Sequence, residues 1–173
     1  RLLANIYPDL AATAELAKYD PCWTIMLGLE ADIKPVGRLQ DQFFPIRNEA
    51  AGISLAVPET MRFADKPTLK NITPAALTIQ ANGRWSRQYR DKDRQTVIAR
   101  LCAIWEEISG QTLPPILEAS AHRWLYAKVT EAANENAPRH SDDKKIAIAG
   151  DWLGGPRVEQ AFDSGTAAYL GLC

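Results

Sequence analysis

The residues with the clearest chemical potential lie near the end of the chain, in the segment GDWLGGPRVEQ over residues 150–160. A short apolar run ends there on Gly150 and Asp151. A carboxylate at the end of a strand and beside the start of a helix can accept hydrogen bonds from ligand hydroxyl groups. Gly154 and Gly155 have no side chain beyond the backbone, so a ligand can approach the main chain closely.

A predicted helix follows the glycine turn and adds free backbone groups to this candidate site. Pro156 suits a first helical position because its missing N–H would be unpaired there. The N–H groups of Arg157, Val158 and Glu159 would then point forward, at the positive end of the helix dipole. This arrangement favours an anionic or electron-rich ligand. A strand, turn and helix also occur in any α/β protein, so the spacing by itself leaves ligand binding open.

A second group of candidates alternates along a predicted strand. His122, Trp124 and Tyr126 are two residues apart, so their side chains share one face of a sheet. From the residues alone, Trp124 and Tyr126 can be core aromatics, and His122 can be an ordinary hydrogen-bonded histidine. Neither group of candidates identifies a catalytic residue.

The elements that must position these residues are predicted from apolar periodicity and from glycine and proline breaks. Strands are expected over residues 22–33, 43–46, 52–57, 75–82, 116–130 and 146–150. Helices are expected over residues 8–19, from an N-cap at Ser86, over 93–110, and after Pro156. The strand over 22–33 is nearly all apolar, which predicts burial on both faces. The fold class is therefore α+β, with a mostly antiparallel sheet, packed helices and a C-terminal strand–helix unit.

Composition narrows the classes of function. The 173 residues are 46% hydrophobic and 24% charged, as in an ordinary globular protein with a real core. A net charge of −1 without a basic block argues against a dedicated nucleic-acid or anionic-membrane binder. The longest apolar run, CWTIMLGL, is too short to span a membrane. Three scattered cysteines and two histidines predict neither a disulfide framework nor a metal site.

The start of the chain gives two further expectations. No signal peptide is visible, so we expect a cytoplasmic protein. The first residue is Arg1 rather than methionine, which indicates a chain that begins inside a longer protein.

Four sequence blocks together resemble the bacterial renalase-like group of FAD-dependent amine-oxidase-like proteins. GDWLGGPRVEQAFDSG resembles the C-terminal flavin motif of that group, with Gln160 where the pattern has glycine. AHRWLYAKV, YDPCWTIMLGL and GRWSRQY resemble its His-Arg-Trp, Tyr-x-Pro-Cys-Trp and Trp-Ser segments. The blocks keep the order of the family and span residues 19–168.

The resemblance implies a flavoprotein whose dinucleotide-binding domain is split in sequence. Residues 1–140 would form a substrate-binding domain, and residues 141–173 would supply a strand and a helix that complete the FAD-binding domain. Asp151 would bond the ribityl or pyrophosphate region of FAD, and the first turn of the last helix would face the pyrimidine end of the flavin. Trp124 and Tyr126 would line the substrate cavity over the flavin ring. The GxGxxG segment of the family does not occur in these 173 residues. The implied partner is therefore an N-terminal dinucleotide-binding segment.

The implied activity is oxidation of an amine or a reduced nicotinamide-type small molecule, by hydride transfer to FAD and then to oxygen. The alternative hypothesis is a non-catalytic binding domain that has lost flavin binding. The last helix would then expose the face that a missing domain covers, which predicts self-association through residues 158–172.

Overall fold

The computed structural model describes residues 3–33, 46–59, 75–133, 139–143 and 145–172. The chain divides into two compact units, the sheet unit and the terminal unit. The sheet unit is Pro21–Leu125, and the terminal unit combines Arg1–Asp20 with Tyr126–Cys173. The strand expected over 43–46 lies mostly outside the described residues.

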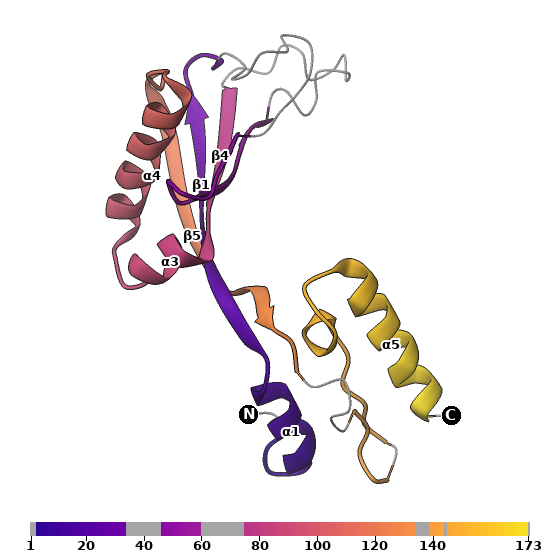
Figure 1. The fold of residues 1–173 in the computed structure, drawn as a ribbon. Coiled ribbons are helices and arrows are strands. Elements are labelled where there is room, and N and C mark those ends of the chain that lie inside the picture. Colours follow the sequence, from indigo (N-terminus) through magenta and orange to yellow (C-terminus); the bar gives the residue numbers. More distant parts are fainter. Residues whose placement is uncertain (1–2, 34–45, 60–74, 134–138, 144, 173) are drawn as a thin grey trace. The chain divides into compact units, whose positions relative to one another are not determined.

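The described strands form one five-stranded sheet in the order β2-β3-β4-β1-β5 (Figure 1). Their bounds are β1 Lys18–Leu29, β2 Ile46–Asn48, β3 Ile53–Pro58, β4 Ala75–Ala81 and β5 Ile116–Glu131. β4 lies between β1 and β3 and pairs antiparallel with both, and β2 pairs antiparallel with β3. The sheet is antiparallel and helices accompany it, so the predicted α+β class is confirmed.

Four α-helices and one 3-10 helix are present in the described part of the chain. The sheet unit contains α3 Gly83–Gln88 and α4 Arg94–Ser109. The terminal unit contains α1 Pro8–Glu15, the 3-10 helix η2 Asp151–Leu153 and α5 Val158–Leu172. Within the described ranges, none of these helices has the length and apolar character that a membrane crossing requires.

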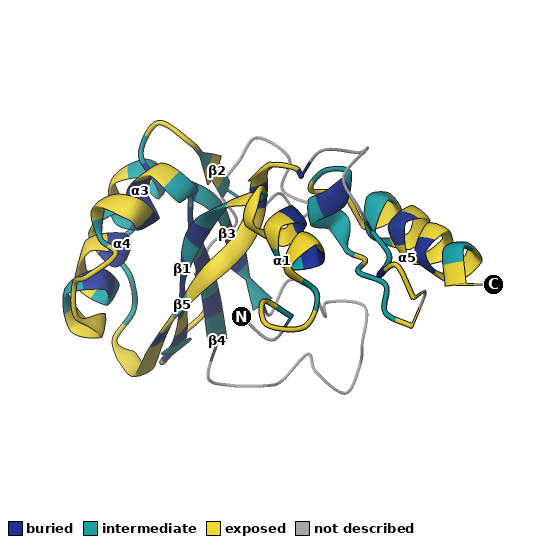
Figure 2. Ribbon diagram, turned by 90° about the horizontal axis from the view of Figure 1, so that it is seen from below, coloured by how far each residue is buried: buried dark blue, intermediate teal, exposed yellow. Residues whose placement is uncertain are grey.

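The core of the sheet unit lies between the sheet and the two helices α3 and α4. β4 alternates buried and half-buried residues, as expected of a strand with one covered face. The buried cluster joins this face to one side of β1 and of α4; its members include Ile25, Leu27, Leu77, Ile79, Val97, Leu101 and Trp105. Met26 is exposed on β1, so the prediction that this strand is buried on both faces is wrong at that position. β5 is exposed along most of its length (Figure 2).

The ends of the two helices in the sheet unit show why these segments are helical. Asp93 caps α4: its Oδ1 accepts from the Thr96 N–H at 2.9 Å, and its Oδ2 accepts from the Thr96 hydroxyl. These bonds lower the pKa of the Asp93 carboxyl. Gly110 ends α4 with a left-handed φ of 67°, as its position in the sequence predicts.

The predicted cap of the shorter helix is wrong. Asn82, not Ser86, caps α3, because its Oδ1 accepts from the Trp85 N–H at 2.9 Å. Ser86 lies inside the helix and is buried, and its Oγ accepts from the Trp23 N–H of β1 at 3.0 Å. The serine therefore joins the helix to the sheet instead of starting the helix.

Candidate functional site

The segment before the candidate turn is not the strand that its apolar pattern indicates. Ala147 forms a single antiparallel bridge with His140, and residues 146–150 are otherwise outside any strand. The Ser141 N–H donates to Ile146 O at 2.8 Å, and the Ile148 N–H donates to Arg139 O at 2.9 Å. The segment is thus held by a short local pairing.

Gly150 and Asp151 form a tight turn that leads into η2. The N–H groups of Gly154 and Gly155 both donate to Asp151 O, at 3.0 and 2.7 Å. Gly150 has a φ of 156°, and a Cβ at this position would collide with the Trp152 indole. Glycine is therefore required at residue 150.

α5 anchors this turn from one side. The Gly150 N–H donates to the Ser164 hydroxyl oxygen at 3.0 Å, and Ser164 is buried on α5. Because Ser164 lies near the middle of the helix, this bond fixes the turn against α5.

The side chain of Asp151 is half-buried, and no hydrogen bond or ion pair to its carboxylate occurs among the described residues. Tyr19 lies close enough to interact electrostatically with the Asp151 carboxylate. Burial first, and then the negative charge of Asp151, raises the pKa of the Tyr19 hydroxyl. Tyr19 also contacts Tyr126 edge to face, with ring centroids 5.5 Å apart. In the terminal unit, one carboxylate with free acceptor capacity thus lies near a pair of aromatic rings.

The first turn of α5 presents two free backbone donors. Arg157 donates its own N–H to Gly155 O at 2.9 Å, so this group is used inside the turn. In the described part of the chain, the N–H groups of Val158 and Glu159 have no backbone acceptor. Both residues are exposed. Of the three donors expected from the sequence, two are therefore available to a ligand.

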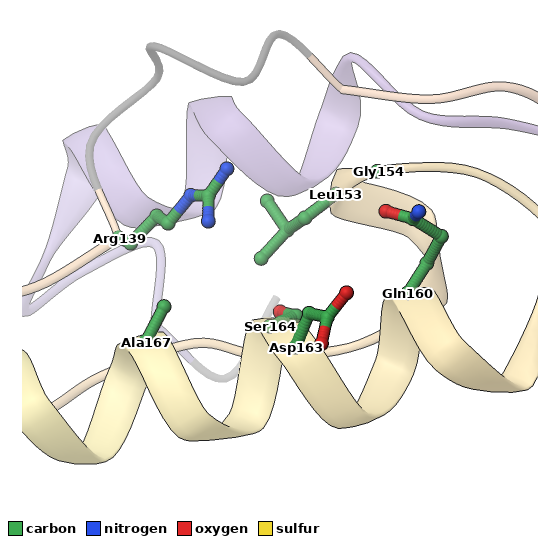
Figure 3. Close-up of a pocket in the computed structure, with 7 residues that line it drawn as sticks. All are labelled: Arg139, Leu153, Gly154, Gln160, Asp163, Ser164 and Ala167. Atoms are coloured by element: carbon green, nitrogen blue, oxygen red, sulfur yellow. The ribbon is translucent and has the colours of Figure 1, made fainter.

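A small hollow of about 200 Å³ lies beside the turn in the terminal unit (Figure 3). Its lining residues are Arg139, Leu153, Gly154, Gln160, Asp163, Ser164 and Ala167. Figure 3 shows the side chains of Arg139, Leu153 and Asp163 pointing into it. Gln160 replaces the glycine of the flavin motif and folds back over the turn, since a Cβ on Gly154 would collide with its amide oxygen. The hollow combines charged groups of both signs.

Residue types and spacing alone do not place Arg139 or Asp163 in the site. Asp163 could have been found, because it follows Gln160 by three residues and so lies on the same side of the helix. Arg139 stands in a polar connector, and nothing in its neighbours in sequence signals that it lines a hollow.

The second group of candidates is exposed. Trp124 is 55% exposed and Tyr126 is 78% exposed, so the interpretation of both rings as core aromatics is wrong. His122 contacts the Trp124 ring with centroids 4.3 Å apart. Trp124 belongs to the sheet unit and Tyr126 to the terminal unit.

The two described cysteines are poor candidates for a nucleophile. Cys22 and Cys102 are both free thiols. Burial, with a smaller contribution from the charge of Glu106, raises the pKa of Cys102 to about 11. Burial also raises the pKa of Cys22. Since the thiolate is the reactive form, neither side chain is activated near neutral pH.

No family model matches the chain. A solved structure from Exiguobacterium sp. 255-15, described as a "putative protoporphyrinogen oxidase", matches it with a TM-score of 0.56 and 13% sequence identity. The two proteins share a fold. The match covers 98% of this chain and 38% of that protein, so this chain spans well under half the length of the protein it resembles.

Proposed function

We propose that this chain is part of an FAD-dependent oxidoreductase of the renalase-like, amine-oxidase-like type. Residues 1–140 would be its substrate-binding domain, and residues 141–173 would complete the FAD-binding domain. The observation that carries the proposal is the turn at Gly150 and Asp151. This short segment contains a position that only glycine can occupy and a carboxylate that can accept further hydrogen bonds. It also contains two helix N–H groups without a backbone acceptor. The fold shared with a protein described as an oxidase supports the proposal.

The residues of the turn fit the parts of FAD that they would hold. Ribityl hydroxyl groups are donors, and Asp151 offers a carboxylate that accepts hydrogen bonds. The pyrimidine end of a flavin carries acceptor atoms, and Val158 and Glu159 offer N–H donors. A Cβ on Gly155 would meet no atom within 4 Å, so space is open beside the turn. Bound FAD would supply a ring that accepts a hydride from the substrate.

The backbone of α5 would contribute electrostatically to this chemistry. Negative charge placed at a helix N-terminus is stabilised by the dipole and by the free N–H groups. Val158 and Glu159 are the residues of this chain that would provide that stabilisation. We assign no proton-transfer residue, because the cofactor carries the redox chemistry of such enzymes.

The substrate class proposed is an amine or a reduced nicotinamide-type small molecule. Trp124 and Tyr126 are separate candidates for contact with the substrate, because they belong to different units and both present exposed aromatic surface. Aromatic side chains are common in the walls of small-molecule sites. The proposed intramolecular partner is an N-terminal dinucleotide-binding segment that would hold the ADP part of FAD.

The test uses the protein expressed from its complete reading frame. We expect the purified protein to show the visible absorbance of oxidised flavin, or to acquire it when FAD is added to the apoprotein. A complete, folded protein that stays colourless and takes up no FAD in titration calorimetry would contradict the assignment.

A second candidate function is self-association through α5, and one observation favours it. Val158, Phe162, Tyr169 and Leu172 lie at spacings of three, four or seven residues, and all are exposed. Val158 is 84% exposed and Phe162 is 74% exposed. We call these four residues the α5 stripe. Apolar surface of this kind marks interaction sites on soluble proteins.

Phe162→Glu is expected to abolish association of the 173-residue chain. A carboxylate at the centre of the α5 stripe would have to lose its hydration in any contact made there. Sedimentation velocity over a series of concentrations measures the effect. Ala167→Glu is the matched control, since Ala167 is an exposed residue of the same helix that lies five positions after Phe162 and so points away from the stripe. A wild-type chain that remains monomeric throughout the series would exclude this second function.

A further inference from the structure

Among the described strands, the one at one edge of the sheet is long. β5 is the last strand in the sheet order, and its side away from β1 has no neighbouring strand among the described residues. The strand runs from Ile116 to Glu131, and its residues are mostly exposed. A free strand edge offers a row of backbone N–H and C=O groups to which another extended segment can pair.

A groove of about 580 Å³ accompanies this edge within the sheet unit. Its lining residues are Arg94, Gln95 and Ile98 of α4, Ala119, Ser120, Ala121, His122 and Trp124 of β5, and Met26. Ala121 belongs to the core cluster that includes α4, whereas His122 and Trp124 alternate with it. Successive side chains of a strand point to opposite faces. A groove that contacts both faces of β5 therefore lies over its outer edge.

We propose that this groove binds an extended acidic peptide segment, which adds to β5 as a further strand beside α4. Main-chain hydrogen bonds to the free edge would hold the segment. Side chains of α4 and of β5 would then select its sequence.

The charge of the groove favours an acidic partner. Arg94 is exposed at the first position of α4, and neither a hydrogen bond nor an ion pair of its side chain occurs in the described ranges. It stands at the positive end of the helix dipole. Asp93, next to it, stays negatively charged, but both of its oxygens accept from Thr96 and it is not a lining residue of the groove. No carboxylate is among the lining residues.

The apolar residues of the groove favour a partner with alternating character. Met26 and Trp124 are exposed, and Ile98 is half-buried. In an added strand, every second side chain lies on the same face. A segment that alternates apolar and acidic residues would place its apolar side chains on one face and its carboxylates on the other.

The first experiment measures binding of a fluorescein-labelled heptapeptide of alternating valine and glutamate, with blocked ends, by fluorescence anisotropy. The complete protein is used. We expect saturable binding, weakened at least about tenfold by Arg94→Glu, since reversal of a facing charge replaces attraction with repulsion. Arg100→Glu is the matched control on the same helix, because Arg100 is exposed and is not a lining residue. A valine–lysine heptapeptide should not bind.

A second pair of probes tests strand addition itself. Two forms of the peptide carry N-methyl groups at its odd or at its even positions, which removes the N–H donors along one edge. We expect one form to lose binding and the other to retain it, because an added strand pairs through one edge only. Absence of saturable binding, or equal loss with both forms, would overturn the proposal. So would a dimer of the complete protein that Ser120→Pro dissociates, since a second copy would then occupy the edge. None of these measurements depends on flavin.

Discussion

Trp105→Ala is expected to destabilise the sheet unit by about 3–5 kcal/mol, the cost of a large cavity in a well-packed core. Trp105 is 1% exposed and is among the largest buried side chains of the chain. It lies on α4 within the cluster that joins this helix to β1 and β4. Its removal takes apolar contacts from both layers at once. Urea denaturation followed by far-UV circular dichroism measures the change in the free energy of unfolding.

Trp124→Ala provides the matched control for this experiment. The same chemical change is made there on an exposed side chain, so the expected cost is below about 1 kcal/mol. Equal losses in the two variants would show that α4 is not anchored through Trp105, contrary to the packing described above.

The elements that the sequence predicts well are those whose caps, stops and apolar faces lie close together in the chain. α4 has its cap at Asp93, its stop at Gly110 and an apolar face between them, and all three are local in the chain. α3 shows the limit of such signals. Asn82 and Ser86 are both good cap residues; in the structure Asn82 is the cap, and the Ser86 hydroxyl accepts from the Trp23 N–H of a distant strand.

The strand predictions are wrong where the sequence does not show which segment pairs with the strand. Residues 146–150 have a strand-like composition, but their contacts with residues 139–141 are too few to make more than one bridge. β1 starts at Lys18, earlier than expected, and runs through Pro21. A single sequence shows the tendency of a segment to be extended, and it does not show which segment lies opposite.

α5 shows the same limit for a helix. The apolar spacing of this segment predicts one face that includes Phe162, Ala168 and Tyr169. The structure divides that face, because Phe162 and Tyr169 are exposed whereas Ala168 is buried. Periodicity shows which residues share a face of a helix, and tertiary contacts decide which face is covered.

In the candidate site too, local features can be predicted from the sequence and tertiary contacts cannot. Gly150 and Asp151 can be singled out because glycine and a carboxylate have distinctive chemistry in a short turn. The engagement of the Arg157 N–H by Gly155 O depends on the exact path of the backbone. The position of Arg139 beside the hollow depends on a contact between distant segments. Neither can be derived from residue types.

Asp151→Ala is expected to weaken FAD binding by the complete protein about ten- to a hundredfold, which corresponds to loss of a hydrogen bond to a charged group. The described residues offer the Asp151 carboxylate no hydrogen-bond or ion-pair partner, so its removal should leave the fold intact. A ligand hydroxyl would lose its acceptor. Titration of the apoprotein with FAD measures the dissociation constant, and the thermal unfolding midpoint of the apoprotein checks the fold.

Asp142→Ala separates a local effect from a change in overall charge. Asp142 is an exposed aspartate of the same terminal unit and is not a lining residue of the hollow beside the turn. Both variants lose one negative charge, so long-range attraction for the anionic cofactor changes alike in the two. Weakening by Asp151→Ala alone would place that carboxylate at the cofactor. Equal affinities in the two variants, with flavin still bound, would remove Asp151 from the site and leave the flavoprotein assignment to rest on the helix N-terminus.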